Sequence, residues 1–157
     1  MTTQERARVG MVVISVAVGV MGLAGLVVAR DIGFTAPRGA LMGWSGFELG
    51  LLTVNPLGAI LTFVAGLAAL AGAVTRRWAA VVGAAGALAL MAAQVIVQWG
   101  GSPNWLGSRG TNLSFWLAAA VALASLSWVV RVVEQHEPSA QPPAVLRPGS
   151  AGRARVR

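Results

Sequence analysis

The chain of 157 residues contains no cysteine and no lysine, and only 11% of its residues are charged. Without cysteine, disulfides, thiolate metal sites and thiol chemistry are excluded. Histidine occurs once, as His136, which leaves b-type haem ligation, serine–histidine proteolysis and metal sites within apolar segments without the residues they need. Because a soluble domain carries roughly 25% charged residues, the shortage of charge argues against a soluble fold.

Hydrophobic residues make up 56% of the chain and are concentrated in long runs without a charged side chain. Asn55 suits the cap of a helix and Pro56 its first position. The run that begins there has 19 residues and would extend about 28 Å as a helix, enough to cross a hydrocarbon core. The pattern predicts an all-α integral membrane four-helix bundle with spans at residues 10–29, 56–74, 78–98 and 114–130.

Polar segments divide the chain into three parts. Residues 1–9 are predicted to be a polar N-terminus and 10–133 the membrane domain. The first run is too long for the core of a signal peptide and no small-x-small cleavage site follows it, so it is expected to be retained. Proline, alanine, serine and arginine dominate residues 134–157, which are expected to form a disordered basic tail. The loop between spans one and two is apolar and is expected to lie at the interface or fold over the bundle.

Arginine supplies all the positive side chains, and the formal net charge is +7. The N-terminus, the connection 75–77 and the C-terminal region carry nine arginines on one side, against Arg30, Arg38 and Arg109 on the other. This asymmetry predicts that both termini are cytoplasmic. The arginines flank apolar spans or lie in the tail, which favours a membrane over a nucleic-acid partner. The Ala-, Gly- and Arg-rich composition is typical of a high-GC bacterium and hence of a bacterial plasma membrane.

Tryptophan is expected at the ends of the spans, where its amphipathic ring suits the headgroup level. The sequence places Trp78 and Trp128 at the inner boundary. The outer boundary is expected to hold Trp44, Trp99, Trp105 and Trp116.

Small residues three or four positions apart let transmembrane helices approach closely. The candidates for helix packing are Gly19, Gly22, Gly25, Ala65, Ala69, Gly72, Ala79, Gly83 and Ala87. Packing inside the single bundle is the favoured interpretation, and an oligomer or partner interface is the alternative. On the favoured interpretation, Gly83→Leu disrupts the bundle and lowers the amount of folded protein.

Polar and aromatic residues near the outer ends of the spans form a candidate pocket. Gln94 and Gln98 share one helix face, where they bond a neighbouring helix or a ligand. Arg38 and Glu48 in the outer loop pair with one another or stay solvated. Irregular backbone near membrane depth usually lines a cavity or is buried in protein. The candidate pocket residues are Trp44, Glu48, Asn55, Gln94, Gln98, Asn104, Trp105 and Arg109.

The predicted spans contain no ionisable side chain, so the residues that proton- and ion-coupled transporters use are missing from them. GxSxG, P-loop and dinucleotide-binding patterns are absent. The sequence therefore predicts no enzyme, cofactor or metal site. It predicts a structural or accessory protein that packs in the lipid bilayer against a membrane-protein partner or as a homo-oligomer, with no nucleic acid. The alternative is a passive pore or carrier for a neutral or lipophilic small molecule.

Residues 49–70, LGLLTVNPLGAILTFVAGLAAL, resemble the DUF4383 family of small actinobacterial membrane proteins. The segments 104–106 (Asn-Trp-Leu) and 111–113 (Thr-Asn-Leu) are similar to the Asn-rich start of that family's fourth span. The resemblance implies four spans and no established activity. Family members often carry histidines one and two turns into the second span, where this chain has Gly58 and Thr62, so no role of those histidines is carried over.

Overall fold

The structure is a computed structural model that describes residues 1–29, 47–49, 52–98 and 105–136. Four long helices and a two-stranded hairpin make up these ranges. They are α1 (Thr3–Val28), β1 (Phe47–Leu49), β2 (Leu52–Val54), α2 (Pro56–Thr75), α3 (Trp78–Gln98) and α4 (Gly110–His136). Each helix is long and apolar enough to span a membrane, which confirms the prediction of four such helices. The predicted outer loop (30–46) and most of the tail (137–157) lie outside the described residues.

The boundaries of α2 follow from local chemistry. The Asn55 side chain accepts a hydrogen bond from the Gly58 amide, and Pro56 occupies the first turn, where no amide is needed, as predicted. At the other end Arg76 adopts a left-handed conformation with φ of 58°. The Arg77 amide then bonds the Gly72 carbonyl, which is the satisfied helix end that such a residue provides. Two residues thus reverse the chain, and α3 starts at Trp78.

Two helices begin earlier than predicted. The side chain of Thr2 accepts from the Glu5 amide while the Glu5 carboxylate accepts from the Thr2 amide, and this capping box starts α1 at Thr3. The fourth span was expected to begin at 114, but α4 starts at Gly110. There the Asn112 side chain accepts from the Arg109 amide at 3.1 Å, so it caps the helix from inside the first turn.

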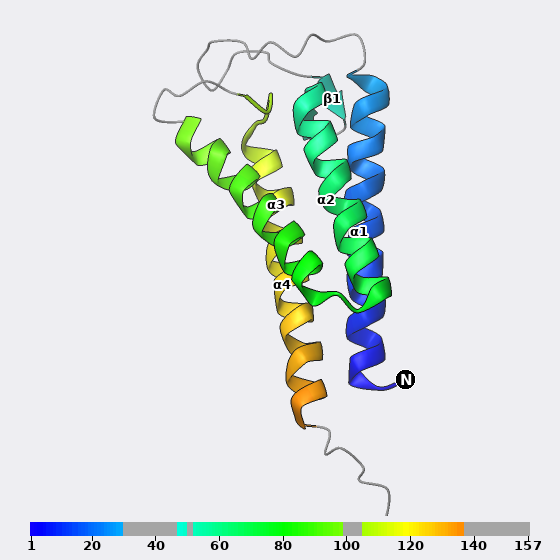
Figure 1. Cartoon of the computed structure of the whole chain (residues 1–157). Coiled ribbons are helices and arrows are strands. Elements are labelled where there is room, and N and C mark those ends of the chain that lie inside the picture. Colours follow the sequence, from blue (N-terminus) through cyan, green and yellow to red (C-terminus); the bar gives the residue numbers. More distant parts are fainter. Residues whose placement is uncertain (30–46, 50–51, 99–104, 137–157) are drawn as a thin grey trace, which may run out of the picture.

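The short hairpin was not predicted. β1 and β2 are antiparallel, and their register pairs Phe47 with Val54 and Glu48 with Thr53. The hairpin leads directly into the cap of α2, with β1 in contact with α1 and β2 in contact with α4. It lies at the end of the bundle opposite the N-terminus (Figure 1).

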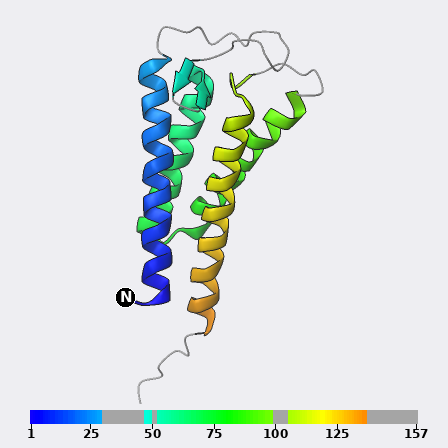
Figure 2. The same ribbon diagram turned by 180° about the vertical axis from the view of Figure 1, so that it is seen from behind.

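The helices alternate in direction, so the N-terminus and the last turns of α4 lie at the same end (Figures 1 and 2). We call this the basic end, because it holds the arginines of the described chain other than Arg109: Arg6, Arg8, Arg76, Arg77 and Arg131. The opposite end is the loop end. The most extensive contact joins α1 to α2, followed by α3 to α4, while α3 is inclined away from α2 toward the loop end (Figure 1).

Candidate functional site

The closest helix contact lies between α1 and α2 and depends on glycine. A Cβ at Gly22 would overlap the backbone of Phe63, and a Cβ at Gly66 would lie 2.6 Å from the Cα of Gly19. Only a residue without a side chain allows two helix backbones to come so near. The predicted packing residues on these two helices (Gly19, Gly22, Gly25, Ala65, Ala69 and Gly72) are all buried.

The packing residues predicted on α3 lie elsewhere. Ala79, Gly83 and Ala87 are exposed, and nothing lies within 4 Å of a Cβ built at Gly83. The buried side of α3 is instead formed by Val81, Ala84, Ala85, Leu88, Met91, Ala92, Val95 and Gln98. The expectation that Gly83 packs inside this bundle is therefore wrong. In a helix that is apolar on every side, spacing alone did not identify the face that turns inward.

At the loop end, Asn55 ties three parts of the chain together. Its Oδ1 accepts from the Gly58 amide at 2.7 Å, and its Nδ2 donates to the Trp105 carbonyl at 2.9 Å. The side chain is 1% exposed, so both bonds form away from solvent. A Cβ at Gly58 would lie 2.7 Å from the Leu106 carbonyl oxygen, which explains why the segment before α4 can lie so close to α2.

Two more buried polar contacts continue this arrangement. Gln98, at the end of α3, donates through Nε2 to the Ser108 carbonyl at 3.1 Å. Trp116 Nε1 donates to Thr62 Oγ1 at 3.1 Å, and that hydroxyl donates to the Gly58 carbonyl at 2.7 Å. Trp116 was expected at the outer boundary, but it is 2% exposed and is the largest fully buried side chain of the described chain.

The predicted outer pocket is only partly assembled. Asn55 meets the backbone of Trp105, and Gln98 bonds the segment next to Arg109, so these residues close the loop end and do not line an open polar cavity. Glu48 lies in the middle of β1, opposite Thr53. Gln94 and Trp105 line a separate, apolar groove. Trp44, Arg38 and Asn104 lie outside the described residues.

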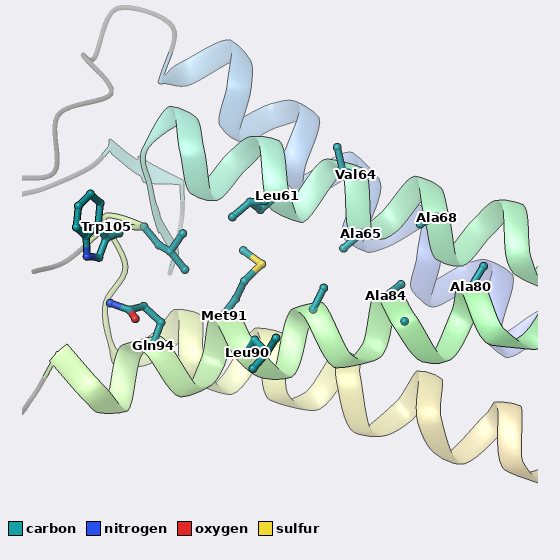
Figure 3. A pocket seen from close by; sticks show the side chains of 13 residues that line it. Leu61, Val64, Ala65, Ala68, Ala80, Ala84, Leu90, Met91, Gln94 and Trp105 are labelled. Carbon is teal, nitrogen blue, oxygen red and sulfur yellow. The ribbon is translucent and has the colours of Figure 1, made fainter. Parts of the chain in front are cut away.

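That groove has a volume of about 630 Å³. It lies between α2 and α3, where the two helices diverge (Figure 3), and its lining includes the exposed side chains of Leu61, Val64 and Leu90. Gln94 and Trp105 stand at its loop end, and Ala80 stands toward the opposite end (Figure 3). The other lining residues are Ala65, Ala68, Gly83, Ala84, Ala87, Met91 and Leu106.

Sequence reasoning missed this groove, although it named five of its lining residues: Ala65, Gly83 and Ala87 for helix packing, and Gln94 and Trp105 for the pocket. Its walls are ordinary apolar side chains such as Leu61 and Met91, which carry no signal distinct from the rest of a span. Apart from the Trp105 indole, Gln94 is the one polar side chain of the lining, so it was the only residue that could have indicated the groove from the sequence. The groove exists because α3 is inclined, and that inclination is a tertiary property.

The described ranges bring together no group of three histidine, aspartate or glutamate side chains that could hold a metal ion. No protein-family model, no curated protein and no solved structure matches this chain. The resemblance to the DUF4383 family therefore stays a prediction. In the described structure, the positions where that family often has histidines hold Gly58, in contact with the Leu106 backbone, and Thr62, which accepts from Trp116.

Proposed function

We propose that this chain is a non-enzymatic accessory protein of a bacterial plasma membrane, which docks a transmembrane helix of a partner protein in the groove between α2 and α3. The proposal includes the orientation inferred from arginine placement, with both termini and the basic end in the cytoplasm. The observation that carries it is the shape of the groove. Its lining runs along α3 from Ala80 to Gln94, about 21 Å at 1.5 Å per residue, which is most of the hydrocarbon thickness.

The composition of the walls favours a helix as the occupant. Gly83, Ala84 and Ala87 on α3 face Ala65 and Ala68 on α2, and side chains this small let another backbone come close. Gly83 and Gly86 have open space where a Cβ would stand. Glycine weakens a helix by about 1 kcal/mol relative to alanine, and nothing within the described bundle uses these two. A partner helix in the groove gives Gly83, which lines it, a role.

The test is site-directed cross-linking in the native membrane. Because the chain has no cysteine, Gly83→Cys introduces a single thiol, and the open space beside Gly83 accepts it. A photoreactive maleimide attached there should give one discrete cross-linked product, identified by mass spectrometry. The matched control is Ala118→Cys, also a small exposed residue within an apolar helix, but on α4. It should give no such product.

The outcomes separate the identities of the partner. A product with another membrane protein supports the accessory role. A product with a second copy of this chain supports helix docking but replaces the accessory role with self-assembly. Adducts with lipid alone, equal at both positions, would contradict the proposal.

A second candidate rests on the same groove. Its volume of about 630 Å³ is within the range of roughly 300–1,000 Å³ typical of ligand clefts, and Gln94 and the Trp105 indole supply polar groups at one end. These features suit a lipophilic small molecule. If a small molecule occupies the groove, the photoreactive maleimide on Gly83→Cys should form no cross-link to a protein. The maleimide should instead compete with the small molecule for the groove.

A further inference from the structure

The arginines at the basic end have no protein partner within the described chain. The side chains of Arg6, Arg8, Arg76, Arg77 and Arg131 form none of the hydrogen bonds or ion pairs found among the described residues. The single ion pair there joins the amino terminus to Glu5 at 4.0 Å. Five positive side chains at one end of a bundle with four membrane-length helices thus have no acidic partner among the described residues.

The two carboxylates described at this end accept hydrogen bonds from neutral donors, and Glu5 also pairs with the amino terminus. Glu5 accepts from the Thr2 amide at 2.7 Å in the capping box of α1. Glu134 accepts from Trp78 Nε1 at 3.1 Å and from Gln4 Nε2 at 3.3 Å, joining α4 to the starts of α3 and α1. Both acids therefore serve the structure, and neutralisation of the arginines is left to a group outside the described chain.

An apolar groove of about 440 Å³ opens beside one of these arginines, between α1 and the last turn of α2. Along α1 its lining begins with the Met1 and Glu5 side chains at the helix start, continues through Arg8, and then becomes apolar. The apolar part consists of Val9, Val12, Val13, Ala73 and Val74. Two residues beyond Val74 the chain reaches Arg76 and then Arg77. A positive group thus stands at the polar mouth of a hydrocarbon-lined groove.

We infer that this groove is a binding site for an anionic phospholipid of the leaflet at the basic end. The phosphate pairs with the Arg8 guanidinium, and one acyl chain lies along the valines of α1 beside Ala73 and Val74. Basic pockets between transmembrane helices are suited to anionic headgroups. In a bilayer the valines distinguish little between one hydrocarbon chain and another, so selectivity comes from charge. Glu5 lies one turn nearer the helix start, on the water side of the phosphate, where its cap and the amino terminus hold it.

The full-length protein, purified in mild detergent, would be titrated with phosphatidylglycerol or phosphatidylcholine, and bound lipid would be counted by native mass spectrometry. The wild type should bind the anionic lipid several-fold more tightly. Arg8→Gln should weaken that binding about fivefold, as expected for one arginine near anionic headgroups. Arg6→Gln is the matched control: it removes the same charge from the same helix, but at a position outside the groove lining, and should leave the affinity unchanged.

A second variant tests the groove independently of charge. Val13 is 61% exposed, so Val13→Trp should fill the groove without disturbing the core and should lower the affinity for phosphatidylglycerol. Equal losses in Arg6→Gln and Arg8→Gln would show diffuse attraction to the whole basic end and overturn the site. Equal affinity of the wild type for the two lipids, or unchanged binding in both Arg8→Gln and Val13→Trp, would overturn it as well.

Discussion

Single glycines decide which helices of this bundle touch. Gly22 faces the backbone of Phe63, whereas Gly83 faces open space, although both are glycines within an apolar helix. The spacing of small residues in the sequence predicted the same packing role for both. The difference arises because α1 and α2 cross at contact distance along their small residues, while α3 buries the face with Val81, Leu88 and Met91 and turns Gly83 outward.

This contrast gives a matched pair of substitutions. Gly22→Ala should lower the thermal unfolding midpoint in detergent, because the added methyl group overlaps backbone that cannot move as a flexible side chain would. Overpacking of this kind costs about 1–3 kcal/mol. Gly83→Ala should leave the midpoint unchanged or raise it, because alanine stabilises a helix by up to about 1 kcal/mol relative to glycine. A loss in Gly83→Ala as large as that in Gly22→Ala would mean that α3 packs inward through Gly83.

At the scale of the element, the residue ranges of the four helices could largely be predicted from the sequence, whereas the faces that they turn inward could not. α2 and α3 lie within a residue of their predicted spans, because Asn55, Pro56 and the reversal at Arg76–Arg77 are local signals. The capping box of Thr2 and Glu5 was equally local, but it was hidden by treating residues 1–9 as a separate polar segment.

The missed features share a physical cause. In a soluble helix the polar face marks the outside, but a membrane helix is apolar all round, so periodicity carries little information about orientation. Trp116 was therefore assigned to the boundary although it is buried against Thr62. The β1–β2 hairpin was missed because its three-residue strands lie in a Gly-rich apolar stretch without a clear alternation.

Asn55 both caps the start of α2 and holds the segment before α4 at the loop end. Losing a helix cap usually costs about 0.5–2 kcal/mol of stability. Asn55→Ala should cost more than this, because the bond to the Trp105 carbonyl is lost as well. Asn55→Ser keeps a good cap but is too short to hold Trp105. Thermal unfolding of the three proteins should therefore rank the wild type first, then Ser, then Ala. Equal midpoints for Ser and the wild type would show that the Trp105 contact contributes nothing.

At the scale of the whole molecule, the two ends of the bundle differ in what stabilises them. The loop end is closed by buried side chain–backbone hydrogen bonds from Asn55 and Gln98. The basic end carries unpaired arginines and is held by the contacts of Glu134 with Trp78 and Gln4. An end that carries most of the described arginines and an opposite end with only Arg109 suit a protein inserted in one direction, because positive loops are retained on the cytoplasmic side.

The proposed orientation gives the last prediction, and the absence of cysteine makes it simple to test. Thr75→Cys places one thiol at the exposed end of α2 beside Arg76, and Thr111→Cys places one at the exposed start of α4. A membrane-impermeant maleimide added to intact cells should label Thr111→Cys, whereas Thr75→Cys should react only after the membrane is opened. The cysteine-free wild type is the control for background labelling.

Labelling of Thr75→Cys alone in intact cells would invert the topology and place the basic end, with its proposed lipid site, in the outer leaflet. Labelling of both in intact cells would show that the two ends of α2–α4 are not separated by the membrane, against the four-span arrangement itself.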